Sequence, residues 1–287
     1  MSNFSQKTRR ASLHGPEIEH CLNVIQSTYG HTADVQQKGK SLNKFGRTNN
    51  ADAGVRTTVA TFGSVATINV NETLATTNAI DTVSSSSASD TEVLSLEGHT
   101  IDASGNLTFV VQDVTLTGQT VVTLDTPLAR ANRLYVKDGT FASPSSDLVG
   151  DVYVFESGGT VTSGVPQTSA DVHLRIVAGK NQTEKCATAI SSTDYWIISG
   201  VTVSMARTGG STVAVDFELE VCGRGGVWRP LGATIDVSKN APFAAVSFSP
   251  HRIIRPNSDV RMVATSTAAD TIVSAEIEGY LASFADA

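Results

Sequence analysis

The fold class of this 287-residue chain is decided by one stretch, Val213-Ala214-Val215-Asp216-Phe217-Glu218-Leu219-Glu220-Val221. Apolar side chains occupy its odd-numbered positions, and acids occupy positions 216, 218 and 220. Successive side chains on a β-strand point to opposite faces, so this pattern predicts one dry face and one solvent-exposed face. Such strands are typical of antiparallel sheets, because the strands of parallel sheets are usually buried on both faces.

Similar short runs recur along the chain, separated by Gly, Pro, Asn and Ser. Gly105-Asn106 and the run 223–226 are predicted to be hairpin tips. About eight strands, spaced by about ten residues, favour an antiparallel β-sandwich or jelly roll. We therefore expect a mainly β protein in three parts. They are an N-terminal basic arm with one short helix (1–60), a small β meander domain (61–138) and a jelly-roll-like sandwich domain (139–287).

The N-terminal part carries the candidate docking residues. Residues 16–29 are predicted to form a helix, since Ile18, Leu22 and Ile25 recur at helical spacing. A helix this short is marginal alone in water, so it must pack on the body or on a partner chain. A basic group with one aromatic follows, consisting of Lys38, Lys40, Lys44, Phe45 and Arg47. Such a group could grip nucleic acid, but it is more often a solvated or protein-docking arm, and we expect no nucleic-acid partner.

The charge distribution supports a docking arm. Residues 1–60 hold 8 Lys/Arg and 4 Asp/Glu, a balance of +4, whereas residues 61–287 hold 13 and 24, a balance of −11. A basic arm on an acidic body indicates that the arm docks on something acidic, while self-repulsion keeps the body soluble. The alternative is an N-terminus that is merely solvated.

The cysteines do not form a metal-binding or redox pattern. Cys21, Cys186 and Cys222 are far apart, and no CxxC pair occurs. Free, mostly buried thiols are the default and fit assembly in a reducing cytoplasm, although a bridge between Cys186 and Cys222 is conceivable. We find no signal-peptide pattern and no apolar run long enough to span a membrane, so we expect no membrane partner.

No motif nominates a catalytic residue, a cofactor or a metal. The six histidines show no metal-ligand spacing, and we expect His173 to be structural. Glu218 with Glu220, and Glu276 with Glu278, are carboxylate pairs of the kind that glycoside hydrolysis uses. Both pairs lie on strand faces that the alternation marks as exposed, so we expect them to serve solubility. The chain is therefore predicted not to be an enzyme.

The chain resembles a group of structural proteins found in the virions of tailed bacteriophages, over most of its length from about residue 15. The segments that carry the resemblance include Lys44-Phe45-Gly46-Arg47, Leu96-Glu97-Gly98, Leu116-Thr117-Gly118-Gln119-Thr120, Gly150-Asp151-Val152-Tyr153-Val154, Gly225-Gly226-Val227-Trp228-Arg229, Ile254-Arg255-Pro256-Asn257-Ser258-Asp259-Val260-Arg261 and Ile277-Glu278-Gly279-Tyr280. The resemblance implies a non-enzymatic virion component, assembled in the host cytoplasm, whose N-terminal arm docks on the particle and whose jelly roll faces outward. Its partners would be major capsid, portal or tail proteins. Whether it decorates the capsid or acts as an adaptor at the neck or tail stays open.

Two further expectations concern the surface. A β-sandwich with exposed edge strands tends to aggregate unless those strands are protected or paired with another subunit. We therefore expect a symmetric homo-oligomer, such as a trimer. The alternative function is a receptor- or carbohydrate-binding module of a tail or head fibre. Its candidate aromatic platforms are Tyr195, Trp196, Trp228 and Tyr280. We expect Trp196 to lie in the core, which leaves Trp228, beside Arg224 in the Gly-rich turn, as the surface candidate.

Overall fold

A computed structural model describes residues 40–60, 74–140, 145–207 and 213–283. Within these ranges the chain is almost entirely strand and turn, with one 3-10 helical turn at Ser169–Asp171. The predicted mainly β class with an antiparallel sandwich is confirmed. The helix expected at 16–29 lies outside the described residues. Among the described residues, no helix has the length and apolarity needed to cross a membrane.

The strands follow one another closely along the chain. In the first half they are β1 (Lys40–Ser41), β2 (Lys44–Ala51), β3 (Arg56–Thr58), β4 (Ile80–Ser85), β5 (Val93–Ile101), β6 (Leu107–Thr115), β7 (Val122–Leu128), β8 (Arg130–Val136), β9 (Val152–Glu156), β10 (Val161–Thr162) and β11 (Val165–Pro166). In the second half they are β12 (Val172–Ile176), β13 (Ala187–Ala189), β14 (Asp194–Ala206), β15 (Ala214–Gly223), β16 (Arg229–Pro230), β17 (Ile235–Ser238), β18 (Phe243–Ile254), β19 (Ser258–Ser266) and β20 (Thr271–Ser283).

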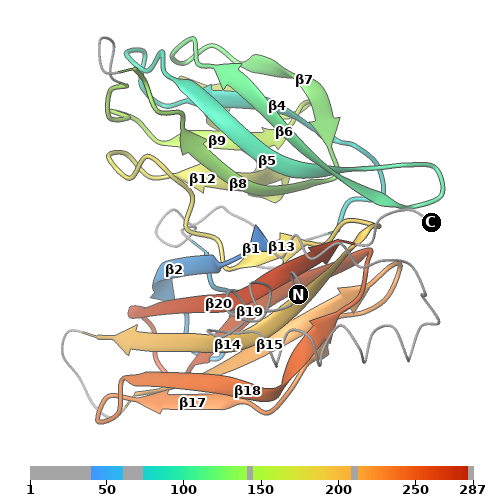
Figure 1. The fold of residues 1–287 in the computed structure, drawn as a ribbon. Coiled ribbons are helices and arrows are strands. Elements are labelled where there is room, and N and C mark those ends of the chain that lie inside the picture. Colours follow the sequence, from blue (N-terminus) through green and yellow to red (C-terminus); the bar gives the residue numbers. More distant parts are fainter. Residues whose placement is uncertain (1–39, 61–73, 141–144, 208–212, 284–287) are drawn as a thin grey trace, which may run out of the picture.

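The strands form two bodies, drawn one above the other in Figure 1. In the upper body, a sheet of order β12-β9-β4-β7 packs on a sheet of order β6-β5-β8. Their apolar faces share a core that includes Leu94, Leu96, Leu134 and Val154, all fully buried. We call this the first body.

The second body is the sandwich that the opening stretch predicts. One sheet, which we call sheet A, has the order β1-β20-β14-β18, with β2 also paired to β20. The other has the order β13-β19-β15-β16, with β3 on β19 and β17 on β15. Val213, Val215 and Phe217 are fully buried between the sheets, as their alternation predicts. Burying one large apolar side chain contributes about 1.5–3 kcal/mol, so each of these side chains stabilises the sandwich substantially.

The bodies do not follow the predicted boundaries along the chain. β9 and β12 lie beyond residue 139, yet β9 pairs with β4 and both belong to the first body. The cause is the run 152–155, which is buried on both faces and completes the sheet of the first body. The N-terminal strands also depart from the predicted arm, since β2 pairs with β20 and β3 pairs with β19 in the second body.

Candidate functional site

The residues predicted to form a docking arm are only partly described. Those outside the described residues are Ile18, Leu22, Ile25 and Lys38. Lys40 lies on β1, and its Nζ is 5.8 Å from the centre of the Phe109 ring on β6. Phe45 and Arg47 project from the outer face of β2, where both are exposed. In this part of the chain the three residues are therefore held by strands of the second body.

Lys44 is not available for docking, which corrects its assignment to the arm. Its side chain is buried, and Nζ donates a hydrogen bond of 2.8 Å to the carbonyl oxygen of Asn132 on β8. Burial, with the nearby charge of Lys185, lowers the pKa of Lys44 from 10.5 to about 8. The alternation of β2 explains the error, because Lys44 shares its inward face with Gly46 and Thr48.

Trp228 is not the exposed aromatic platform that the sequence suggests. Its ring is half-buried, and the guanidinium of Arg261 lies 4.1 Å from the ring centre. A cation over the ring face is a favourable contact, and it occupies one face of the ring. Arg224 is exposed, but its side chain lies against Gly105. A Cβ added to Gly105 would be only 2.7 Å from Arg224 Nε. Both residues thus have neighbours within the chain.

Glu220 is buried, although the alternation marks it as exposed. Only 2% of its side chain is accessible, and it forms ion pairs with Arg261 at 2.9 Å and with Arg56 at 2.8 Å. Glu218 pairs with the same Arg56. Glu218 and Glu220 are therefore held by two arginines, from β3 and β19. The other carboxylate pair matches the prediction better, since Glu276 is half-buried and Glu278 is exposed.

One buried constellation has the residue types of a nucleophile, a base and an orienting group. His99 Nε2 lies 3.2 Å from Ser191 Oγ, and His99 Nδ1 lies 2.8 Å from Asn132 Nδ2. Asn132 Oδ1 accepts a hydrogen bond from the backbone N–H of Ala189, which orients the amide so that Nδ2 donates to Nδ1.

This orientation gives the histidine the wrong tautomer for activating the serine. Because Nδ1 accepts, Nε2 carries the proton and donates it to Ser191 Oγ, whereas a general base must accept the serine proton there. Burial and the charge of Arg130 lower the pKa of His99 to about 3, so the ring is neutral. Sequence reasoning did not connect these residues. They lie on β5, β8 and the turn after β13, and they tie the two bodies together.

The thiols and potential metal ligands are accounted for within the described residues. Cys186 and Cys222 are free and buried, as the default predicts. His173 lies 2.9 Å from Glu156 Oε1 on the neighbouring strand β9, in the structural role expected of it. The described ranges contain no group of three His, Cys, Asp or Glu side chains placed to hold a metal ion.

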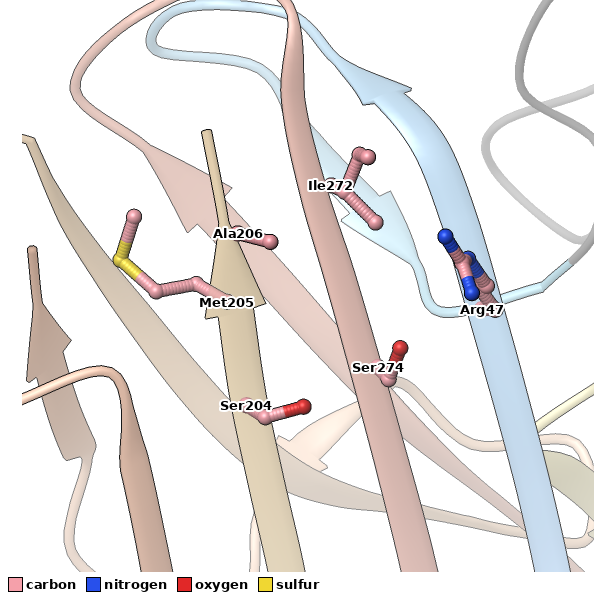
Figure 2. A pocket seen from close by; sticks show the side chains of 6 residues that line it. All are labelled: Arg47, Ser204, Met205, Ala206, Ile272 and Ser274. Atoms are coloured by element: carbon pink, nitrogen blue, oxygen red, sulfur yellow. The ribbon is translucent and has the colours of Figure 1, made fainter. Parts of the chain in front are cut away.

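The outer face of sheet A carries a small pocket. Figure 2 shows Ser204, Ser274 and Arg47 on three neighbouring strands, β14, β20 and β2. Met205, Ala206 and Ile272 complete the lining. Arg47 is the one charged side chain in this set, so the pocket lacks the convergent ionisable groups of a catalytic site. Arg47, Ser274 and Ser204 are directly opposed across neighbouring strands, and Ser204 is opposed in turn by Phe243 on β18.

β18 is the free edge of sheet A. Among the described strands it pairs with β14 alone, and it lies on the side of the second body away from the first body (Figure 1). At the opposite side of the sheet the backbone of β2 is covered, since Arg47 N–H bonds to the carbonyl oxygen of Glu184 at 3.4 Å. The stretch 242–250 contains no charged residue, and Phe243 is 60% exposed. An exposed, uncharged edge is a template for pairing with another chain.

The register shows which backbone groups of β18 point outward. Met205 N–H bonds to the carbonyl oxygen of Pro242, and Ser204 opposes Phe243. In an antiparallel ladder, hydrogen-bonded and non-hydrogen-bonded pairs alternate. Phe243, Ala245 and Ser247 therefore direct their N–H and C=O groups away from β14. The sequence analysis did not predict this edge, although the lack of charge over 242–250 was a visible signal.

No protein-family model matches the chain, and no curated protein sequence matches it. Solved structures with a distant likeness include that of the infectious bursal disease virus Gt strain, with 10% identity, a TM-score of 0.21, and coverage of 91% of this chain and 77% of that chain. Another is the VP2 subviral particle of infectious bursal disease virus, with 12% identity, a TM-score of 0.20, and coverage of 92% and 77%. At these TM-scores the likeness carries no argument about fold or function.

Proposed function

We propose that this chain is a non-enzymatic structural subunit of a virus particle, of the kind found in tailed bacteriophages. The observation that carries the proposal is the open edge of β18, whose residues 243–250 carry no charge, in a chain whose residues 61–287 have a balance of −11. An edge of this kind is normally protected in a protein that works alone. An open edge on β18 suits a subunit of an assembly. When copies of the chain or other virion proteins assemble, they cover this edge.

The finer assignment rests on the N-terminal segment. Residues 1–39 hold 4 of the 21 Lys/Arg and precede the first strand of the second body. In the proposed function this segment docks on a capsid, portal or tail protein, and the two β bodies face outward as a decoration protein or an adaptor. Many copies then multiply a modest contact by avidity.

The receptor- or carbohydrate-binding alternative has less support. Its best candidate, Trp228, has its ring under Arg261, and Trp196 is fully buried. A lectin site usually needs an accessible aromatic face beside polar groups. The described residues offer no such combination at either tryptophan.

Particle incorporation tests the proposed function. Tagged full-length chain and a variant lacking residues 1–39 are each produced in cells in which virus particles assemble, and the purified particles are probed for the tag. We expect the full chain in the particles and the shortened chain in the soluble fraction. Tryptophan fluorescence of the shortened chain checks that Trp196 is still buried. The proposal fails if the full chain is absent from particles, and the docking role fails if both chains are incorporated equally.

A further inference from the structure

We propose that β18 pairs antiparallel with β18 of a second copy, around a two-fold axis that passes beside Ala245. The inference rests on the proposed function in one respect, that the chain associates with other protein chains. It names the partner as a second copy and specifies the register of the contact.

The outward backbone groups match under this symmetry. Phe243, Ala245 and Ser247 all point their N–H and C=O groups to the free edge. With the axis at Ala245, Phe243 opposes Ser247 of the second copy, and Ala245 opposes its own counterpart. All three opposed pairs then fall in hydrogen-bonded positions, where each pair exchanges both its N–H···O bonds. A register shifted by one residue would place the outward groups opposite inward ones.

The side chains match as well. Phe243, Ala245 and Ser247 lie on the outer face, while Ala244, Val246 and Phe248 pack toward the core. In the proposed register the exposed ring of Phe243 lies beside Ser247 and Ala245 of the second copy, so a large side chain meets two small ones. Aromatic contacts across strands stabilise sheets by burying the ring against the neighbouring strand.

Charge favours a second copy at this place on the surface. Elsewhere the acidic bodies repel each other, but the stretch 242–250 brings no charge to the contact. Because the contact is isologous, each copy uses the same residues. The order Phe243, Ala245, Ser247 on one copy faces the order Ser247, Ala245, Phe243 on the other. The result is one continuous sheet that runs from β2 of one copy to β2 of the other.

Disulfide trapping tests the register directly in the full chain. The background variant carries Cys21→Ser, since Cys186 and Cys222 are buried. Ala245→Cys is expected to form a covalent dimer under mild oxidation, because the Cα atoms of a hydrogen-bonded pair lie about 5.5 Å apart, within disulfide range. Phe243→Cys and Ser247→Cys are the matched controls. Each is expected to stay uncross-linked alone, and the two are expected to cross-link when mixed.

Sedimentation measures the same contact without oxidation. The full chain is expected to show a concentration-dependent dimer, and Ala245→Lys is expected to raise its Kd about tenfold or more, since two lysines then meet at the axis. Ala245→Ser should leave the Kd unchanged. Unchanged tryptophan fluorescence in both variants excludes misfolding as the cause.

The outcomes separate this inference from the proposed function. A monomer at all concentrations, a trimer, or cross-linking of Phe243→Cys with itself overturns the pairing. If the pairing fails while the full chain still joins particles, the proposed function stands. If the chain dimerises in this register but never joins particles, the pairing stands and the proposed function fails.

Discussion

Glu220 shows how a single residue can follow the pattern of its strand and still depart from its expected environment. It alternates with Leu219 and Val221 on the outer face of β15, as the sequence indicates. On that face, however, Arg261 opposes it directly across the ladder, and Arg56 reaches it from β3. A buried carboxylate needs such partners, because an unpaired buried charge is very unfavourable. The two arginines therefore explain how an acid on the outer face of the strand can be buried.

Lys44 gives a prediction about pH. Burial lowers its folded-state pKa from 10.5 to about 8, so between these values the unfolded chain binds more protons than the folded one. Stability therefore rises with pH across this window, by an amount on the order of 2–3 kcal/mol. Lys44→Met should lack this rise. Urea unfolding gives the free energy of unfolding of the wild type and the variant at pH 8 and pH 10. The difference between the two proteins is expected to be larger at pH 10.

The control for this prediction is Lys180→Met, which changes an exposed lysine in the first body. This variant should keep the rise in stability that the wild type shows. If the Lys44→Met variant shows the same rise between the two pH values, then other groups cause it, and the ammonium of Lys44 is not held in a low-dielectric site.

β2 is the element whose role differs most from its prediction. The stretch 44–51 reads as a basic arm, but it is a strand at the corner of the sandwich. Gly46 has no room for a side chain, since an added Cβ would lie 2.1 Å from the carbonyl oxygen of Val59 and 2.5 Å from the backbone nitrogen of Cys186. The close approach of these two segments closes this side of the second body.

Gly46→Ala should therefore destabilise the protein by about 1–3 kcal/mol, because the backbone of β2 must move away from Val59. Gly232→Ala is the matched control, since a Cβ at Gly232 meets nothing within 4 Å, and it should change stability by less than about 0.5 kcal/mol. Chemical denaturation measures both. An effect of Gly46→Ala as small as that of the control would mean that β2 is a loosely held arm after all.

The same elements show how far sequence reasoning reaches. The alternation of β15 and the turn at Gly105-Asn106 are local patterns, and both predictions agree with the structure. The run 152–155 has no alternation because it is buried on both faces, so its place in the first body was not predictable from period alone. The edge position of β18 and the His99–Ser191 contact depend on strand order, which joins residues 92 positions apart. No local spacing encodes such a pairing.

In the whole molecule, the two bodies are joined by polar contacts. Arg130 of β8 pairs with Asp259 of β19 at 2.7 Å, and both side chains are about nine-tenths buried. Leu107 N–H bonds to Asn257 Oδ1, and Lys44 Nζ bonds to the carbonyl oxygen of Asn132. Unlike an apolar interface, such a layer holds only one relative orientation, because each displaced donor or acceptor would be left unsatisfied. The proposed pairing of β18 needs such a fixed orientation, because both copies must present this edge in the same way.

Asp259→Asn should weaken this junction, since it leaves the guanidinium of Arg130 buried without a counter-charge, at a cost of about 3–5 kcal/mol. Both tryptophans, Trp196 and Trp228, lie in the second body, whereas far-UV circular dichroism reports the strands of both bodies. The two signals should share one midpoint during unfolding of the wild type and separate in the variant. Asp113→Asn, which removes an exposed ion pair with Lys137, should leave the midpoints together. If the two midpoints still coincide after Asp259→Asn, the ion pair is not what couples the bodies, and the remaining contacts of the layer must hold them as one cooperative unit.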